Sequence, residues 1–323
     1  MTYDHADLRH AAAAAVRAPS LHNSQPWRFR LRAGAIEVLA DQQRQLAVAD
    51  STGWAVRIAC GAAITNARLA LAVAGAPAEV VLCPDRTEPD LLARLTPGPR
   101  RPATYTETDL AAAVPRRYSN RRPFWPDPVP PDVRQRLVDA AREESSFLDL
   151  LVGMTALSGF AEIAQSADRV LRRDLSYQAE MSTWTHADEA PDGVAVPAGA
   201  PVPEPQDLLP QRVFSDRRRA PGRDFEPEPL VAILGTAGDR PHDQLVAGQA
   251  LQRVLLTVTD AGLACSMISQ PIEVPAARDQ LRRSLRRSGS PQIALRIGYG
   301  HPGRPSPRRD LTEVLASDDP AGR

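Results

Sequence analysis

The sequence contains no lysine. All 39 of its basic residues are arginines, and 39 acidic residues balance them to a formal net charge of zero. The absence of lysine excludes a P-loop, whose lysine reaches the phosphates, and a Schiff-base lysine enzyme. The neutral balance also argues against a general nucleic-acid or membrane-surface binder, which would carry a basic excess. We therefore expect neither nucleic acid nor a membrane as a partner.

Cysteine and histidine are scarce and dispersed. Cys60, Cys83 and Cys265 lie far apart without a CxxC pair, as expected of free thiols in a reducing compartment. No histidine stands at metal-ligand spacing from another histidine or a cysteine, so we expect no catalytic metal. Charged residues near the N-terminus exclude a signal peptide, and the apolar run 150–161 is too short to span a bilayer. The sequence predicts a soluble, cytoplasmic protein.

Common catalytic motifs are also missing. The sequence has no HExxH, no EF-hand loop and no G-x-S-x-G elbow. Residues 298–303 match G-x-G-x-x-G, but Pro302, Pro305 and Pro307 prevent the helix that a dinucleotide-binding unit needs after its glycines. We therefore exclude a Rossmann site.

Proline and apolar residues are abundant. The 323 residues include 31 prolines, roughly twice average usage. With 43% hydrophobic residues the chain has enough material for a substantial core, and its length suggests about two domains. Helices and strands alternate in the predicted order, which indicates an α/β or α+β architecture. The predicted helices span 4–17, 55–74, 132–144, 160–171 and 245–261. The predicted strands span 26–31, 35–40, 79–83, 147–152 and 292–297, with 265–269 as a strand or loop.

Two proline-rich stretches are predicted to lie outside these elements. Residues 84–109 are polar and favour a connection between two halves. Residues 190–210 contain six prolines and little periodicity, so we predict a surface excursion of the kind that is often functional or mobile.

The two longest predicted helices share a pattern at an offset of 187 residues. Chance is one explanation, because small residues and leucine are common in helices. The other is a duplicated unit whose two core helices pack around a pseudo-twofold axis. The identical pairs are Gly61/Gly248, Ala63/Ala250, Leu69/Leu256, Ala74/Ala261 and Gly75/Gly262.

Three polar segments carry most of the chemical information. Residues 18–27, APSLHNSQPW, place hydroxyl and amide side chains between two prolines. This segment is either an ordinary helix-to-strand turn or a stiff polar edge that grips a planar heteroaromatic ligand.

Residues 116–124, RRYSNRRPF, form the second segment. Alternation places Arg117, Ser119 and Arg121 on one face of an extended chain and leaves the other side chains to solvent. Guanidinium groups suit phosphate oxygens, so a single phosphate is favoured over a solvated charge run or a nucleic-acid patch. The third segment, 304–309, is either a basic tail or brings Arg308 and Arg309 to the same anion.

Together these segments resemble the nitroreductase-like flavoprotein family, whose members are dimers that bind FMN at the subunit interface. In that family a PS-x-x-N-x-QPW segment borders the flavin ring, an R-x-S-x-[KR] arm holds the phosphate, and a C-terminal basic pair completes the phosphate site. Residues 262–269 match by position the family segment near flavin N5, although the family's Glu-Gly pair is missing there. The resemblance implies an α+β fold and FMN bound by Pro19, Ser20, Leu21, His22, Asn23, Gln25, Arg117, Ser119, Arg121, Ser266, Met267, Ile268, Arg308 and Arg309.

The order of the segments departs from that of a simple nitroreductase. The arginine arm follows the PS-x-x-N segment by about ninety residues, no second PS-x-x-N segment occurs at the 187-residue offset, and no arm precedes the first segment. This layout resembles the Acg-type branch, whose members carry the label NAD(P)H nitroreductase. It implies a fused pseudo-dimer with halves at 1–105 and 106–323, each with an antiparallel sheet and long core helices, and one composite FMN site. A single chain would then suffice for the site.

The resemblance implies that flavin N5 carries the chemistry and that no side chain acts as a nucleophile. Hydride would pass from NAD(P)H to a small electron-poor acceptor such as a nitroaromatic or a quinone. Two alternatives remain open. One is a non-enzymatic FMN store in which 190–210 covers the flavin, and the other is an FMN-dependent dehydrogenase of a natural-product intermediate.

Overall fold

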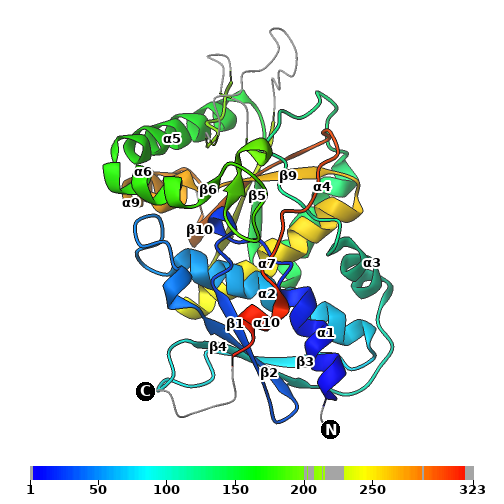
Figure 1. Ribbon diagram of the computed structural model, residues 1–323. Helices are drawn as coiled ribbons and strands as arrows, with labels where there is room; N and C mark the ends of the chain where they lie inside the picture. Colours follow the sequence, from blue (N-terminus) through cyan, green and yellow to red (C-terminus); the bar gives the residue numbers. More distant parts are fainter. Residues whose placement is uncertain are drawn as a thin grey trace.

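Two four-stranded antiparallel sheets and a set of helices make up the molecule (Figure 1). The computed structural model describes residues 3–199, 202, 207–212, 214, 229–285 and 287–316. The first sheet contains β1 (Trp27–Arg32), β2 (Ala35–Ala40), β3 (Ala78–Leu82) and β4 (Leu91–Pro97). The second contains β5 (Phe147–Leu151), β8 (Leu230–Thr236), β9 (Ala264–Ile268) and β10 (Ser290–Gly298). This is the predicted α+β class.

Helices surround and separate the sheets. They are α1 (His5–Ala15), α2 (Trp54–Val73), α3 (Tyr105–Ala113), α4 (Pro131–Glu143), α5 (Met154–Arg173), α6 (Leu175–Thr183), α7 (Pro241–Asp260), α8 (Gln270–Glu273), α9 (Pro275–Ser284) and α10 (Leu311–Val314). A short parallel pair joins β6 (Thr185–His186) to β7 (Val194–Ala195). Figure 1 shows α2 and α7 between the two sheets.

Both halves have the same topology. In each, two strands precede a 20-residue helix and two strands follow it, and the spatial order is β1-β2-β4-β3 in one sheet and β5-β8-β10-β9 in the other. The first and last residues of α7 each lie 187 positions after those of α2, the offset found in the sequence.

The two long helices meet at a pair of glycines. A Cβ added at Gly61 would lie 2.8 Å from the Gly248 Cα and 2.3 Å from the Leu245 carbonyl oxygen. A Cβ added at Gly248 would lie 2.2 Å from the carbonyl oxygen of Ile58, which is the counterpart of Leu245 at the same offset. These reciprocal contacts favour a duplicated unit over chance.

Helix α2 is buried on nearly every side, as its apolar sequence predicts. By length and composition alone it could cross a membrane, but 83% of its most apolar window is buried inside the fold. Its residues contribute to the cores of both halves, since Trp54 and Ile58 join the core of the second half and Ile64 joins that of the first. The helix therefore acts as a core helix shared by the two sheets.

Two segments cross between the halves. After α3 the chain reaches the second sheet, where the Asn120 N–H donates to the Cys265 carbonyl at 2.8 Å. The C-terminal tail returns to the first sheet, where the Ala316 N–H donates to the Phe29 carbonyl at 2.7 Å. These crossings bring the arginine arm and the C-terminal basic pair to the junction of the halves.

The structure corrects three predictions of secondary structure. The connection predicted at 84–109 contains β4, a central strand of the first sheet, and the start of α3. No element was predicted for β8, which lies inside the second sheet with every residue buried. In the excursion predicted at 190–210, the described part contains β7 and a 3-10 turn at Val196–Ala198, whereas 200, 201 and 203–206 lie outside the described residues.

Candidate functional site

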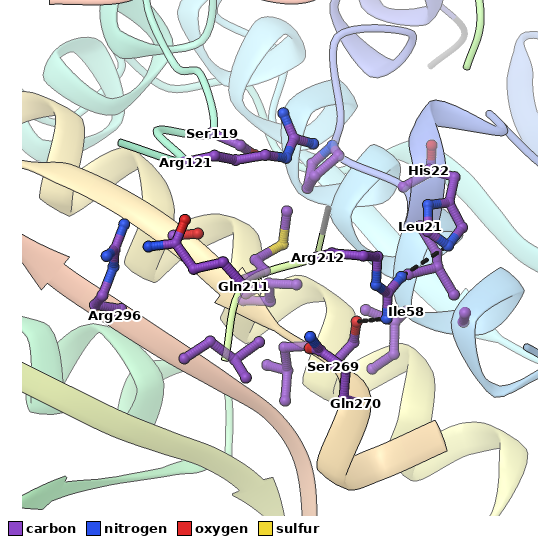
Figure 2. Close-up of a pocket in the computed structure, with 18 of the residues that line it drawn as sticks. Leu21, His22, Ile58, Ser119, Arg121, Gln211, Arg212, Ser269, Gln270 and Arg296 are labelled. Atoms are coloured by element: carbon purple, nitrogen blue, oxygen red, sulfur yellow. Dashed lines mark hydrogen bonds between the residues drawn. The ribbon is translucent and has the colours of Figure 1, made fainter. Parts of the chain in front are cut away.

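A cavity lies where the two halves meet, next to the PS-x-x-N segment and the arginine arm (Figure 2). Its walls come from α2, α7, β9, β10, the two sequence motifs and the end of the proline-rich excursion. The lining residues are Pro19, Ser20, Leu21, His22, Trp54, Ala55, Ile58, Ala59, Ser119, Arg121, Leu209, Pro210, Gln211, Arg212, Phe214, Leu251, Ser266, Met267, Ile268, Ser269, Gln270, Ile293 and Arg296. No acidic side chain is among these described residues.

The PS-x-x-N segment folds into a strained loop. His22, Asn23 and Gln25 have φ angles of 51°, 56° and 53°, in the left-handed region that non-glycine residues rarely adopt. The Ser20 hydroxyl accepts the Gln25 N–H at 2.9 Å and closes the loop. Such strain persists only where surrounding contacts impose it, and it concentrates at functional sites. The loop turns Ser20 and His22 toward the cavity.

Asn23 and Gln25 do not line the described cavity, although both were predicted to bind the cofactor. The Asn23 amide donates to the Pro307 carbonyl at 3.2 Å. The Gln25 amide donates to the Pro191 carbonyl at 2.7 Å and accepts the Arg309 N–H at 3.0 Å. These two side chains join the loop to the C-terminal tail and to the excursion.

The arginine arm passes the cavity in an extended conformation. Ser119 and Arg121 line the cavity, while Arg117 is buried beside it. Asn120 was predicted to face solvent, but the structure shows it to be buried. Its amide donates to the His301 carbonyl and accepts the Arg122 N–H.

Arg117, which is buried, and Arg308, which is partly buried, form a cationic cluster at the end of α1. Arg117 donates to the Arg17 carbonyl at 3.1 Å, and Arg308 donates to the carbonyls of Val16 and Ala18 at 3.1 and 3.0 Å. Burial, together with the charges of Arg117 and Arg17, lowers the pKa of Arg308 to about 9. Burial also lowers the pKa of Arg117 to about 10.

This cluster lacks an internal counter-charge. Among the residues that the structure describes, no carboxylate pairs with Arg117 or Arg308, and the buried Arg117 Nε has no hydrogen-bond partner. Buried charges are normally paired because their desolvation is costly. An anion with several acceptor oxygens, such as a phosphate, would satisfy both guanidinium groups.

Arg309 does not join this cluster through its side chain. Its guanidinium lies 3.4 Å from Glu313 and 3.8 Å from Asp41, both at the side of the first sheet. Its backbone N–H is the part that faces the PS-x-x-N loop. The structure thus brings one member of the predicted basic pair, Arg308, to the arginine arm.

Arg121 lies at a different end of the site from Arg117. Its guanidinium donates to the Ala198 carbonyl at 3.3 Å and lies 5.4 Å from the centre of the Phe214 ring. Burial and the charge of Arg212 lower the pKa of Arg121 to about 10. The arm therefore contributes one arginine to the cationic cluster and another to the cavity.

The floor and the far wall of the cavity come from β9 and α2. Ser266, Met267 and Ile268, which were predicted to bind the cofactor, line the cavity. The α2 residues Trp54, Ala55, Ile58 and Ala59 were not predicted, because a helix that is apolar all round gives no sign of which residues face a ligand.

A polar group of four residues crosses the cavity. The Arg212 guanidinium donates to His22 Nε2 at 2.7 Å, to the Ser269 hydroxyl at 3.2 Å and to the Glu273 carboxylate at 2.5 Å. Figure 2 shows Arg212 between His22 and Ser269. Because arginine only donates, His22 Nε2 must accept, which requires the neutral ring. Burial and the charges of Arg212 and Arg121 accordingly lower the pKa of His22 well below 6.5.

The end of the proline-rich excursion covers this cavity. Leu209 and Pro210, at the end of 190–210, line it together with the following residues Gln211, Arg212 and Phe214, although the sequence predicted 190–210 to be a surface segment. The cavity volume is about 110 Å³, against roughly 300–1,000 Å³ for most small-molecule pockets. The covering segment forms part of the wall that limits this volume.

Sequence comparison shows relatives along nearly the whole chain. A family model described as "Nitroreductase family" matches residues 114–299. "Putative NAD(P)H nitroreductase Rv3131" of Mycobacterium tuberculosis is 33% identical over 95% of this chain and 90% of its own length. "Uncharacterized protein Rv3127" and "Putative NAD(P)H nitroreductase acg" from the same organism are 31% and 29% identical, each over 95% of this chain. Of their own lengths, 92% and 95% are covered.

Solved structures of similar proteins align less closely. A nitroreductase with bound FMN from Desulfitobacterium hafniense aligns with a TM-score of 0.42 and 12% identity, over 65% of this chain and 98% of its own. The FMN-dependent nitroreductase NfnB from Mycobacterium smegmatis, in complex with NADPH, aligns with a TM-score of 0.41 and 16% identity, over 66% and 99% of the chains. The sequence matches are the broader of the two comparisons, since they extend across both halves.

Proposed function

The chain belongs to the nitroreductase family, and from this premise we propose that it is a cytoplasmic FMN-dependent oxidoreductase. Its substrates would be NAD(P)H as hydride donor and an electron-poor acceptor such as a nitroaromatic or a quinone. The observation that carries the proposal is the cluster of buried Arg117 and partly buried Arg308, which lacks a counter-charge among the described residues and lies beside a cavity walled by the family's motifs.

The donor set fits FMN. Arg117 and Arg308 would hold the phosphate, because guanidinium groups bind phosphate oxygens with charge-assisted hydrogen bonds. Ser119 and Arg121 would reach the ring end, and residues 19–22 would border the ring. Residues 19–22 come from the first half, and the arginine arm and the C-terminal tail come from the second, so the site depends on both.

When bound, FMN would supply hydride transfer, and the protein would supply binding, orientation and electrostatics. Ile58, Ala59 and Leu251 form an apolar wall that excludes water. Arg121 brings positive charge to the cavity, and neutral His22 offers a hydrogen-bond acceptor to Arg212. No side-chain nucleophile is required.

We also propose that residues 1–105 and 106–323 are two halves of a fused pseudo-dimer with one composite site. The matching strand orders and the reciprocal contacts of Gly61 and Gly248 support this. Together with the crossing of the arginine arm and the C-terminal tail, they explain how a single chain would assemble a site that dimeric members of the family build from two.

A direct test is to purify the protein and record its absorption spectrum. We expect a yellow protein that releases FMN on denaturation, and that oxidises NADPH or NADH in the presence of a nitroaromatic or a quinone. Failure of the protein to bind FMN after reconstitution would contradict the proposal.

A second candidate function is favoured by the covering segment. If Leu209, Gln211 and Arg212 stay over the flavin, the nicotinamide cannot approach to the roughly 3–3.5 Å that hydride transfer requires. The protein would then store FMN. Replacing residues 207–212 with Gly and Ser separates the two functions. A store should react slowly with NADPH and faster after the replacement, whereas an enzyme should already be competent as the wild type.

A further inference from the structure

The Gln25 side chain is fully buried, and each of its polar atoms has a partner in the protein. Its amide oxygen accepts the Arg309 N–H, and its amide nitrogen donates to the carbonyls of Pro191 at 2.7 Å and Asn23 at 3.3 Å. Gln25 is also not among the described residues that line the cavity. These contacts leave the amide little capacity to bind a ligand directly.

The contacts of this loop bracket Arg308. Gln25 binds the backbone N–H of the residue after Arg308, and Asn23 binds the carbonyl of Pro307, the residue before it. Residues 301–310 form no helix or strand, so side-chain contacts must fix the backbone there. The Arg308 guanidinium then reaches the end of α1 and the neighbourhood of Arg117.

We propose that Gln25 is a positioning residue that holds the Arg308 guanidinium in the phosphate cluster. The inference rests on the proposed function, because it takes FMN phosphate as the anion of that cluster. A glutamine suits this role because one amide offers both the acceptor for the tail and donors for two other carbonyls. Burial makes each lost partner costly, so the geometry is firmly imposed.

The proposal predicts a selective loss of phosphate binding. In Gln25→Leu the Arg309 N–H loses its acceptor and the backbone of Arg308 is released. We expect apoprotein of this variant to bind FMN on the order of tenfold more weakly, the equivalent of losing about one charge-assisted contact. Riboflavin lacks the phosphate, so its affinity should stay within about twofold of wild type by the same reasoning. Quenching of flavin fluorescence measures both dissociation constants without any turnover.

A matched variant separates the two ends of the amide. Gln25→Glu keeps an acceptor for the Arg309 N–H and loses the donors to Pro191 and Asn23. Its ratio of FMN to riboflavin affinity should stay close to that of wild type. A ratio as low as that of Gln25→Leu would overturn the proposal, because the loss would then not depend on the tail contact.

A double-mutant cycle tests whether Gln25 acts through Arg308. In the Arg308→Ala background, Gln25→Leu should weaken FMN binding by less than about twofold further, since residues that act through one contact are not additive. Additive losses would show that Gln25 acts elsewhere and would overturn the proposal.

The outcomes distinguish this inference from the proposed function. If wild-type apoprotein binds no FMN, the proposed function fails. If wild type binds FMN and Gln25→Leu weakens FMN and riboflavin equally, only the positioning role fails. Should Gln25→Leu not fold, Asn23→Ala removes the contact to Pro307 and gives the same readout, with an FMN-selective loss expected and an equal loss for both ligands counting against the proposal.

Discussion

Arg117 and Arg121 lie on one face of the same arm, yet their guanidinium groups reach different places. Arg117 is buried and lies with Arg308 at the end of α1, and Arg121 faces the cavity beside Phe214. The sequence suggested a single phosphate for the whole face. The structure instead favours a division in which Arg117 contacts the phosphate and Arg121 contacts the ring end.

This division predicts different ligand profiles for two alanine variants. Arg117→Ala should lose about 1.5–3 kcal/mol of FMN binding, roughly ten- to a hundred-fold in affinity, with little change for riboflavin. Arg121→Ala should weaken both ligands, because both contain the ring. Titration of apoprotein with each ligand measures this. If Arg121→Ala weakened FMN but not riboflavin, Arg121 would contact the phosphate and not the ring end.

His22 gives the site a dependence on pH. The pKa of His22 in the folded protein lies below 6.5, so the unfolded chain binds its proton more readily. Its contribution to stability is therefore complete above about pH 6.5 and is lost as the pH falls below that value. Asp50 acts in the opposite direction, because burial raises its pKa to about 6 from 3.8 and the folded state takes up its proton first.

A variant isolates the contribution of His22. His22→Asn cannot titrate in this range and tolerates the left-handed backbone. We expect the difference in Tm between wild type and variant to be constant from pH 8 to 7 and to shift against wild type between pH 6.5 and 5. Thermal unfolding followed by circular dichroism would show this. A constant difference down to pH 5 would mean that His22 is not buried as a neutral ring.

At the scale of elements, the crossing of α2 and α7 depends on Gly61 and Gly248. Because an added Cβ at Gly61 would meet backbone atoms at 2.3 and 2.8 Å, no side-chain rearrangement can relieve it. We expect Gly61→Ala to lower the free energy of unfolding by at least about 1–3 kcal/mol, the usual cost of overpacking.

Gly159 in α5 provides the matched control. A Cβ there has nothing within 4 Å, so Gly159→Ala should be neutral or stabilise the protein by up to about 1 kcal/mol through helix propensity. Urea unfolding of the two variants measures both effects. Equal small changes would mean that the two helices are not in close backbone contact.

The sequence predicted the long helices and most strands because their periodicity is local. It missed β4, whose apolar residues lie between prolines and charged residues, and β8, which is short and buried on both faces. A short apolar run of that kind has no period that distinguishes a strand from a segment of buried helix. The pairing of such strands is decided by distant neighbours in the sheet.

The candidate site was predicted only in part, because only some of its residues lie in short segments that can be recognised locally. The two polar motifs were recognisable because each concentrates unusual residues within ten positions, and most of their predicted residues lie at or beside the cavity. The walls from α2 and from Leu209 to Phe214 were not recognisable, since their place in the site follows from tertiary packing. Asn23 and Gln25 belong to the motif, but only the structure shows that they hold the tail.

At the scale of the whole molecule, the two halves share a topology, but the connection between the first helix and the first strand differs in length. Between α1 and β1 there are eleven residues, and they form the strained loop at the cavity. Between α4 and β5, the equivalent elements of the second half, there are three. Three residues cannot supply a loop with the donors and acceptors of residues 19–25. Among the described residues, the second half therefore has no counterpart to this wall of the site.

We accordingly expect one FMN for each chain of 35.0 kDa. Titration of apoprotein with FMN should reach its end point at one equivalent, because the PS-x-x-N loop occurs once and meets the arginine arm at one cavity. An end point at two equivalents would contradict a single composite site. The double variant Arg117→Ala/Arg308→Ala provides a second criterion. If the site is single, the variant should lose essentially all phosphate-dependent binding, since no second cluster remains to take up FMN. Retention of half the wild-type capacity at unchanged affinity would instead require an independent site in the other half.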